Sequence, residues 1–199
     1  MPRVSREQTD RNRLSIEAAS AQLFKQHGFN GVSVSDIMAS AGLTHGGFYG
    51  HFESKDELTA IACTQAFEQS VARWQALNEG RLDEAALIGA LADHYLNARQ
   101  RDEPGLSCPA TALATDVARE SETKPVRKIY TNGVKALIGV IASFSKTRQT
   151  KAARQRTLTR MATLVGALTL ARAVRGDPLS DEILTAAREQ LRADARLGL

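Results

Sequence analysis

Residues 28–58 read GFNGVSVSDIMASAGLTHGGFYGHFESKDEL, and this stretch carries two helix starts in close succession. Ser33 followed by Asp36 predicts a capping box at the start of a short helix. Gly42 predicts the end of that helix, because glycine enters the left-handed conformation without steric cost. Thr44 is the next candidate N-cap. Two short helices joined by a glycine-containing turn form a helix-turn-helix unit.

The second helix of such a unit, expected here at about residues 45–51, lies in the major groove of DNA with its N-terminal residues near base edges. Hydrophobic spacing predicts that the inward-facing side chains are Ile37, Leu43, Phe48 and Phe52. The side chains left facing outward are Thr44, His45, Tyr49 and His51. The stretch therefore predicts a DNA-binding helix.

Gly46 and Gly47 are unusual in so short a helix, since each costs about 1 kcal/mol relative to alanine. We interpret them as allowing the helix to approach a DNA groove closely. The alternative is tight packing against the first helix of the domain.

The rest of the chain also reads as helix. The first helix is expected at about 7–27 and a long fourth helix, opened by Ser54 and Glu57, ends near Asn78. Further helices are expected at about 82–100, 109–119, 123–146, 150–174 and 181–194, the last one capped by Ser180. The prediction is an all-α fold of about nine helices. A three-helix DNA-binding domain (1–53) precedes a helical-bundle regulatory and dimerisation domain (54–199).

Composition narrows the class of protein. The chain has 199 residues, 43% hydrophobic and 24% charged, as in ordinary globular proteins. No stretch approaches the length of a membrane span, and Met1–Leu14 lacks the apolar core of a secretory signal. The two cysteines, without CxxC spacing, favour a reducing cytoplasm and no metal site. No catalytic constellation or phosphate loop is visible, so we expect neither an enzyme nor a cofactor.

The charge is unevenly distributed. Residues 1–55 hold six Lys/Arg and five Asp/Glu, residues 56–120 hold five and eleven, and residues 121–175 hold twelve and one. The low charge of the first segment argues against a non-specific architectural DNA-binding protein, whose affinity comes mainly from phosphate neutralisation. The default interpretation of the basic block 121–175 is a solvated face. Three alternatives stay open: it could be a second nucleic-acid surface, pair with the acidic block 56–120, or attract an acidic effector.

The stretch 28–58 strongly resembles the TetR/AcrR family of repressors, and the resemblance extends over about residues 8–68. It implies that Thr44 caps the recognition helix and contacts a phosphate. It also implies phosphate contacts from Tyr49, His51, Lys55, Ser33 and Ser35. Such contacts position a protein on DNA without reading sequence. Many relatives carry lysine at the position of His45, so we expect sparse direct readout, helped by DNA shape or by Arg3 and Arg6 in an N-terminal arm.

Beyond residue 68 the resemblance is one of layout, in which the last two long helices form the dimer interface. Two apolar stripes on the helix at 150–174 predict contact with both its own core and a partner subunit. The expected interface residues are Leu164, Ala167, Leu168, Ala171, Ile183, Ala187 and Leu191. Candidate effector-pocket residues, chosen for aromatic or polarisable side chains, are Trp74, Tyr95, Cys108 and Tyr130.

The resulting hypothesis is a homodimeric repressor that binds a palindromic operator in double-stranded DNA and is released by a small-molecule effector. A transcriptional activator of the same fold is one alternative. Another is a repressor that senses oxidants or electrophiles through Cys108, which precedes a predicted helix N-terminus where a thiolate is stabilised. A small buried cysteine is the plainer reading of that residue.

Overall fold

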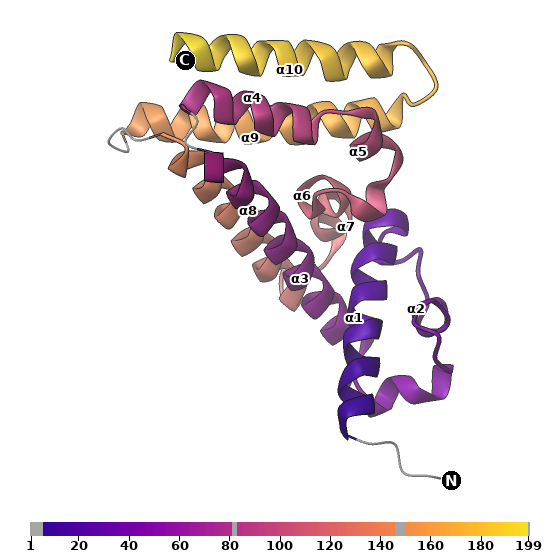
Figure 1. The fold of residues 1–199 in the computed structure, drawn as a ribbon. Helices are drawn as coiled ribbons and strands as arrows, with labels where there is room; N and C mark the ends of the chain where they lie inside the picture. The colour runs from indigo at the N-terminus through magenta and orange to yellow at the C-terminus, as the bar shows by residue number, and fades with distance from the viewer. Residues whose placement is uncertain (1–5, 81–82, 146–149, 199) are drawn as a thin grey trace.

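The computed structural model describes residues 6–80, 83–145 and 150–198, and these residues form helices and connecting turns without any strand (Figure 1). The α-helices are α1 (Arg6–His27), α2 (Val34–Ser40), α3 (Lys55–Ala76), α4 (Glu84–Tyr95), α5 (Ala98–Asp102), α6 (Pro109–Ala112), α7 (Ala114–Arg119), α8 (Pro125–Ser143), α9 (Lys151–Ala173) and α10 (Leu179–Leu197). Three 3-10 helices are η1 (His45–Gly50), η2 (Leu77–Gly80) and η3 (Pro104–Leu106). The predicted all-α class is confirmed.

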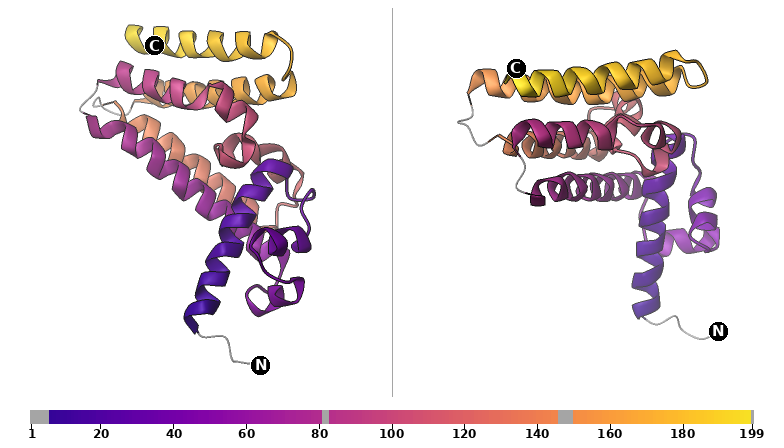
Figure 2. Two further views of the ribbon diagram at one scale, coloured as in Figure 1. Left: turned by 45° about the vertical axis from the view of Figure 1, so that its right-hand side comes forward. Right: turned by 45° about the horizontal axis from the view of Figure 1, so that its top comes forward.

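The helices form a small head and a larger body. The head consists of α1, α2 and η1, and lies below and to the right of the body in Figure 1. In the body, α3 and α8 run side by side, and α10 packs over α9 and α4 (Figures 1 and 2). Helix α3 also packs against α1, so it belongs to both parts. Among the described residues, no helix combines the length and apolar character that crossing a membrane requires.

Two predicted helices are each divided into shorter helices in the structure. The helix expected at 82–100 ends at Tyr95, because Asn97 caps a separate helix by accepting a hydrogen bond from the Gln100 N–H. The helix expected at 109–119 divides into α6 and α7. The predicted capping role of Ser180 is wrong: α10 begins one residue earlier, and the Ser180 hydroxyl donates to the Ala171 carbonyl.

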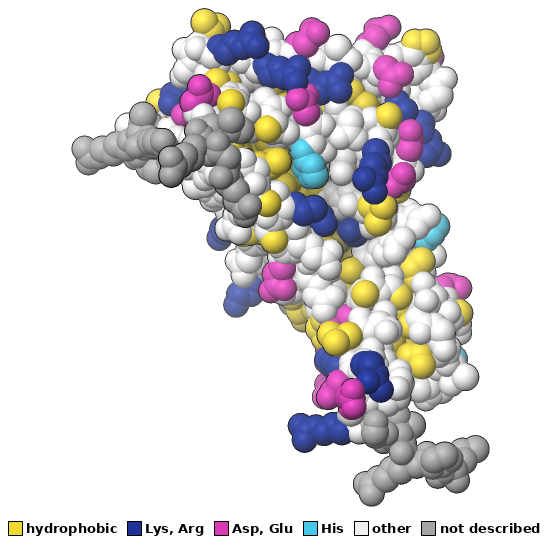
Figure 3. All heavy atoms as spheres, viewed as in Figure 1, with side chains coloured by type: hydrophobic (Ala, Val, Ile, Leu, Met, Phe, Trp, Pro, Cys, Tyr) yellow, Lys and Arg dark blue, Asp and Glu magenta, His cyan; other side chains and the backbone are white. Residues whose placement is uncertain are grey.

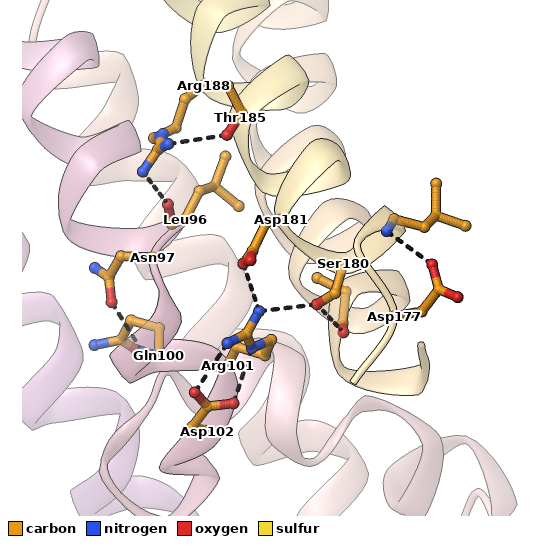
Figure 4. A network of polar contacts seen from close by, with 12 residues as sticks. Leu96, Asn97, Gln100, Arg101, Asp102, Asp177, Ser180, Asp181, Thr185 and Arg188 are labelled. Carbon is orange, nitrogen blue, oxygen red and sulfur yellow. Dashed lines mark hydrogen bonds and ion pairs between the residues drawn. The ribbon is translucent and has the colours of Figure 1, made fainter. Parts of the chain in front are cut away.

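A polar network holds the start of α10 to α5. The Arg101 guanidinium donates to the Ser180 hydroxyl at 3.0 Å and to the Asp181 carboxylate at 2.6 Å (Figure 4). Arg188, about two turns further along α10, donates to the Leu96 carbonyl at 3.1 Å. Helix α10 is therefore anchored to the segment that follows α4, as well as to α9.

Candidate nucleic-acid interface

The head has the geometry of a helix-turn-helix. Its core contains Ile16 from α1, Ile37 from α2 and Phe48 from η1, each with no exposed surface. Gly42 takes a positive φ of 71° in the turn between α2 and η1, as the sequence predicts. The second helix of the unit is a 3-10 helix rather than an α-helix. Two glycines within six residues weaken the α-helix, and the tighter 3-10 form is common in short pieces.

Ser33 and Asp36 form the predicted capping box. The Ser33 hydroxyl accepts from the Asp36 N–H at 3.1 Å, and the Asp36 carboxylate accepts from the Ser33 N–H at 2.8 Å. The hydrogen bonds from Ser33 hold the pKa of Asp36 below its usual value. Because the Ser33 hydroxyl also donates to Asp36 at 2.6 Å, the phosphate contact expected of Ser33 competes with this box. Ser35 points to solvent beside it, with an exposed side chain.

The outward face of η1 is exposed. Tyr49 is 70% exposed, with its ring edge-on to Phe48 at a centroid distance of 5.2 Å. His45, Gly46 and Gly47 are exposed and His51 is half-buried. Thr44 occupies the N-cap position, but its side chain makes no capping hydrogen bond, so the predicted capping role is wrong and the hydroxyl stays exposed.

The glycines of η1 are not required by packing within the chain. A methyl group added at Gly46 would meet nothing within 4 Å, and one at Gly47 would make an ordinary 3.5 Å contact with the Met38 side chain. Neither position lies against α1. The alternative of tight packing against the first helix is therefore wrong, and the open space outside the helix favours close approach by another molecule.

Lys55 has a partner inside the head. Its ammonium donates to the Phe29 carbonyl at 2.6 Å, and the side chain is half-buried. This bond fixes the loop between α1 and α2 to the first turn of α3. A DNA contact from Lys55, as the resemblance implies, would use its remaining N–H groups.

Arg13 is a structural residue that the sequence analysis missed. From the middle of α1 its guanidinium donates to the His51 carbonyl, lies 4.4 Å from the centre of the Phe52 ring and pairs with Glu17 at 3.0 Å. It therefore joins α1 to the end of the recognition helix η1. No local motif signals this role, because the partners are 38 positions apart along the chain.

Three of the four predicted effector residues come together, but as packed core. Trp74, Tyr95 and Cys108 are each at most 4% exposed, and the Trp74 and Tyr95 rings meet edge-to-face at 5.7 Å. The Tyr95 hydroxyl lies 2.5 Å from the Thr111 hydroxyl. Tyr130 is nearer the surface and donates to the Ala110 carbonyl at 2.6 Å. None of the four lines the groove between α3 and α8, described below.

Cys108 does not have the surroundings of a reactive thiol. It precedes α6, but burial raises its pKa above the usual value for cysteine, outweighing hydrogen bonds from Tyr95 and Ser70. Burial likewise raises the pKa of Cys63 to about 12. At neutral pH both residues are thiols, which favours the reading of Cys108 as a small buried residue.

An open groove lies between α3 and α8. It has a volume of about 320 Å³, and its lining residues are Thr64, Phe67, Glu68, Val71, Ile129, Asn132, Gly133 and Ala136. The Phe67 ring lies directly on the backbone of Gly133, where an added methyl group would come within 2.2 Å of it. Phe67 also meets the Tyr130 ring edge-to-face at 5.4 Å. One wall of the groove is therefore aromatic, formed by Phe67 with Tyr130 packed against it.

Part of the basic block pairs with the acidic block. Lys124 forms an ion pair with Asp56, and Arg160 pairs with Glu84 at 2.8 Å. Arg127 donates to the last carbonyls of α7, at Val117 and Glu120. On the face in Figure 3, side chains of both signs are interspersed over α4 and α10. These contacts favour pairing between the two blocks among the readings left open by the sequence.

The head and the body meet at Ser107. The Lys25 ammonium, from α1, donates to the Ser107 carbonyl at 3.3 Å, while Arg172, from α9, donates to the Ser107 hydroxyl at 2.5 Å. Burial, and secondarily the charge of Arg73, lowers the pKa of Lys25 to about 8. One buried residue thus links the helix that supports the DNA-binding unit to a long helix of the body.

Five of the seven predicted interface side chains are buried inside the subunit: Leu164, Ala167, Leu168, Ala171 and Leu191. Their placement on a partner-facing surface is a correction, because these side chains already fill the core of their own subunit. Ile183 and Ala187 are half-buried on α10. The opposite face of α9 is open instead, with Leu170 57% exposed and no atom within 4 Å of a methyl group added at Gly166.

The fold and the exposed recognition helix define a helix-turn-helix DNA-binding protein with a helical second domain. Residues 16–60 match the family model described as bacterial regulatory proteins, tetR family. A TetR transcriptional regulator from Chloroflexus aurantiacus is 26% identical over 96% of both chains, with a TM-score of 0.79. The family-model match over residues 16–60 and this solved structure together support a TetR-family transcriptional regulator. Members of that family are DNA-binding regulators, which supports a DNA-binding rather than an enzymatic role at the family level.

Two other solved structures share the fold. NemR from E. coli, in its reduced form, is 22% identical over 92% of this chain and 95% of that one, with a TM-score of 0.77. FadR from Bacillus subtilis, in complex with stearoyl-CoA, is 14% identical over 90% of this chain and 97% of that one, with a TM-score of 0.68. No curated protein sequence matches the chain.

Proposed function

We propose that the chain is a homodimeric repressor that binds a palindromic operator and leaves it when a small molecule enters the body. The observation that carries this proposal is the outward face of η1, where Thr44, Tyr49 and His45 are exposed beside glycines that no packing within the chain requires. Hydroxyl groups on such a face suit phosphate contacts. Since its target is chromosomal DNA, we assign the protein to the cytoplasm.

The dimer is proposed to form through the outer face of α9 and α10. Exposed and half-buried residues recur there at helical spacing: Ala162, Gly166, Thr169, Leu170 and Ala173 on α9, and Leu179, Ile183, Ala186 and Gln190 on α10. Small side chains at the centre allow two helices to approach closely. A two-fold dimer presents its recognition helices about 34 Å apart, one turn of DNA.

The effector is proposed to enter the groove between α3 and α8. Helix α3 runs from this groove to the head, where it packs on α1, so a displacement of α3 changes the position of the recognition helix. The Lys25–Ser107–Arg172 contacts provide a second connection between head and body. By linkage, effector and operator must weaken each other by the same factor. We retain a division into a DNA-binding domain (1–53) and a regulatory domain (54–199), with α3 as the connecting element.

The competing sensor function of Cys108 is not favoured, because the thiol is buried and its pKa is raised. We expect Cys108→Ser to leave the response of the DNA complex to oxidants unchanged. Loss of an oxidant response in that variant would restore the sensor hypothesis.

The test is selection of bound sequences from a random duplex pool at physiological salt. We expect the wild-type protein to recover a palindrome. Gly166→Arg, which fits the subunit but blocks the α9 face, should be monomeric by light scattering and recover none. Gly139→Arg is the matched control, since Gly139 is also an open, helical position but lies on α8. The absence of any enriched sequence with the wild-type protein would refute the proposed function.

The groove is tested separately with the fluorescent apolar probe 8-anilino-1-naphthalenesulfonate. Saturable binding to the wild-type protein should be lost in Ala136→Trp, which fills the groove, and kept in Gly139→Trp, on the same helix but outside it. Quenching of Trp74, the single tryptophan of the wild-type chain, would report a probe that reaches the Trp74–Tyr95 pair.

A further inference from the structure

A hollow of about 350 Å³ lies beside the recognition helix, between η1, α2 and the N-terminal half of α1. Its lining residues are Thr9, Asn12, Met38, Leu43, Thr44, Gly47, Gly50 and His51. Residues of α1 therefore share one concave surface with the helix expected to enter DNA.

The wall of the hollow on the side of η1 is bare backbone. A methyl group added at Gly50 would meet nothing within 4 Å, and Gly50 lies outside the positive-φ region, so alanine fits its conformation. Neither packing nor backbone geometry within the chain accounts for glycine at this position. A second molecule that contacts the backbone closely would account for it.

The floor and rim of the hollow differ in chemistry. The floor is apolar, with Met38 only 1% exposed and Leu43 half-buried. The rim carries polar groups: the Thr44 hydroxyl, the His51 imidazole and the Asn12 amide. The Asn12 side-chain oxygen accepts from Gln8 at 2.8 Å, whereas its NH₂ group has no hydrogen-bond partner among the residues that the structure describes. The lining contains no carboxylate and no Lys or Arg.

An apolar floor with a rim of donors matches a deoxyribose with its phosphate, which offers an apolar ring edge and acceptor-only oxygens. We propose that this hollow seats the sugar–phosphate backbone of one operator strand. Leu43 lies against the sugar, and Asn12 and Thr44 donate to the phosphate. This inference rests on the proposed function and adds α1 to the DNA-binding surface. It also gives Gly50 its role, since any side chain there narrows the seat.

The proposal is tested by fluorescence anisotropy with the operator recovered by the wild-type protein. Gly50→Ala should bind at least about tenfold more weakly, while its melting temperature stays the same or rises, because alanine reduces the conformational freedom of the unfolded chain. Gly139→Ala is the matched control, also an open glycine within a helix, and should bind like the wild type. Asn12→Ala should weaken binding about threefold to tenfold, equally across operator variants, because backbone contacts carry no sequence code.

The outcomes separate this inference from the function on which it rests. If the wild-type protein binds its operator and both Gly50→Ala and Asn12→Ala retain wild-type affinity, the seat is refuted while the repressor stands. A changed base preference in Asn12→Ala would mean that the hollow reads a base edge, which also refutes a backbone seat. If the wild-type protein selects no operator, both proposals fail together. Asn12→Ala keeps the test decisive even if Gly50→Ala does not fold.

Discussion

The head and the body of this molecule differ in where their predicted functional residues lie: those of the head are mostly exposed, and those of the body are mostly buried. In the head, Tyr49 is 70% exposed and glycines 46 and 50 face open space. In the body, Trp74, Tyr95 and Cys108 are at most 4% exposed, and Tyr95 contacts the other two. Side chains that a fold does not need for its own packing are available to a partner, whereas buried ones stabilise the subunit. The difference fits the proposed function, in which DNA contacts exposed groups of the head and the effector enters the open groove between α3 and α8 rather than the packed core.

The largest loss of stability should follow when a charged side chain is placed in the core of the body. Leu168 has no exposed surface, so Leu168→Arg buries an unpaired guanidinium in place of a packed side chain and should cost more than about 4 kcal/mol, enough to unfold the subunit. Circular dichroism and chemical denaturation measure this. Leu170→Arg, two residues along α9 at a 57% exposed position, should fold normally. A folded Leu168→Arg protein that is merely monomeric would contradict the placement of Leu168 in the core.

A smaller loss of stability is expected from substitution of Arg13, which joins α1 to the end of η1. Arg13→Met removes the bond to the His51 carbonyl and leaves Glu17, only 6% exposed, without its cation. We expect a loss of about 2–3 kcal/mol in unfolding free energy, together with weaker DNA binding. Arg11→Met is the control, because Arg11 has only exposed partners within α1, the Glu7 carboxylate and the Gln8 amide oxygen, and its ion pair is worth less than about 0.5 kcal/mol. Equal effects of the two substitutions would remove the proposed role of Arg13.

The sequence predicted the head far better than the body, and the reason is the range of the interactions. The Ser33–Asp36 box, the Gly42 turn and the inward phenylalanines depend on residues within a few positions of each other. Helical periodicity also identified most helices of the body. It did not assign the two apolar stripes of α9, because periodicity shows that a face is apolar but not which molecule covers it.

The missed residues all act over long separations. Arg13 reaches His51 across 38 positions, Lys25 reaches Ser107 across 82, and Arg101 reaches Asp181 across 80. No local pattern distinguishes these cations from solvated surface charge. The charge imbalance between residues 56–120 and 121–175 was the one available signal, and the Lys124–Asp56 and Arg160–Glu84 pairs show that it reported contacts within the chain.

The contact between head and body can be tested through its pH dependence. Lys25 has a folded-state pKa of about 8 against an ordinary value of 10.5. Between these pH values the unfolded chain binds more protons than the folded one, so the free energy of unfolding should rise with pH across this window. Lys25→Met should abolish that rise and stabilise the fold at pH 7 by about 1–2 kcal/mol. Denaturation at pH 7 and pH 9.5 measures both effects.

The same variant sharpens the comparison of head and body. Without the bond to Ser107, the head has one connection fewer to α9, and effector and operator should weaken each other by a smaller factor than in the wild type. Arg11→Met, an exposed change near the other end of the same helix, should alter neither the pH dependence nor the coupling. An unchanged pH profile in Lys25→Met would show that Lys25 is not the group responsible.

The smallest expected changes come from the same substitution, Tyr to Phe, made once in the head and once in the body. Tyr49→Phe removes a hydroxyl from an exposed ring, so stability should not change, but operator affinity should fall by about threefold to tenfold if that hydroxyl donates to a phosphate. The loss should be equal across operator variants. Tyr130→Phe removes a hydroxyl that donates to the Ala110 carbonyl, and it should cost about 1 kcal/mol of stability without altering operator affinity. Calorimetry measures the stability of both variants, and anisotropy measures their operator affinity. If Tyr49→Phe lowered stability and left affinity unchanged, the Tyr49 hydroxyl would stabilise the head instead of contacting DNA.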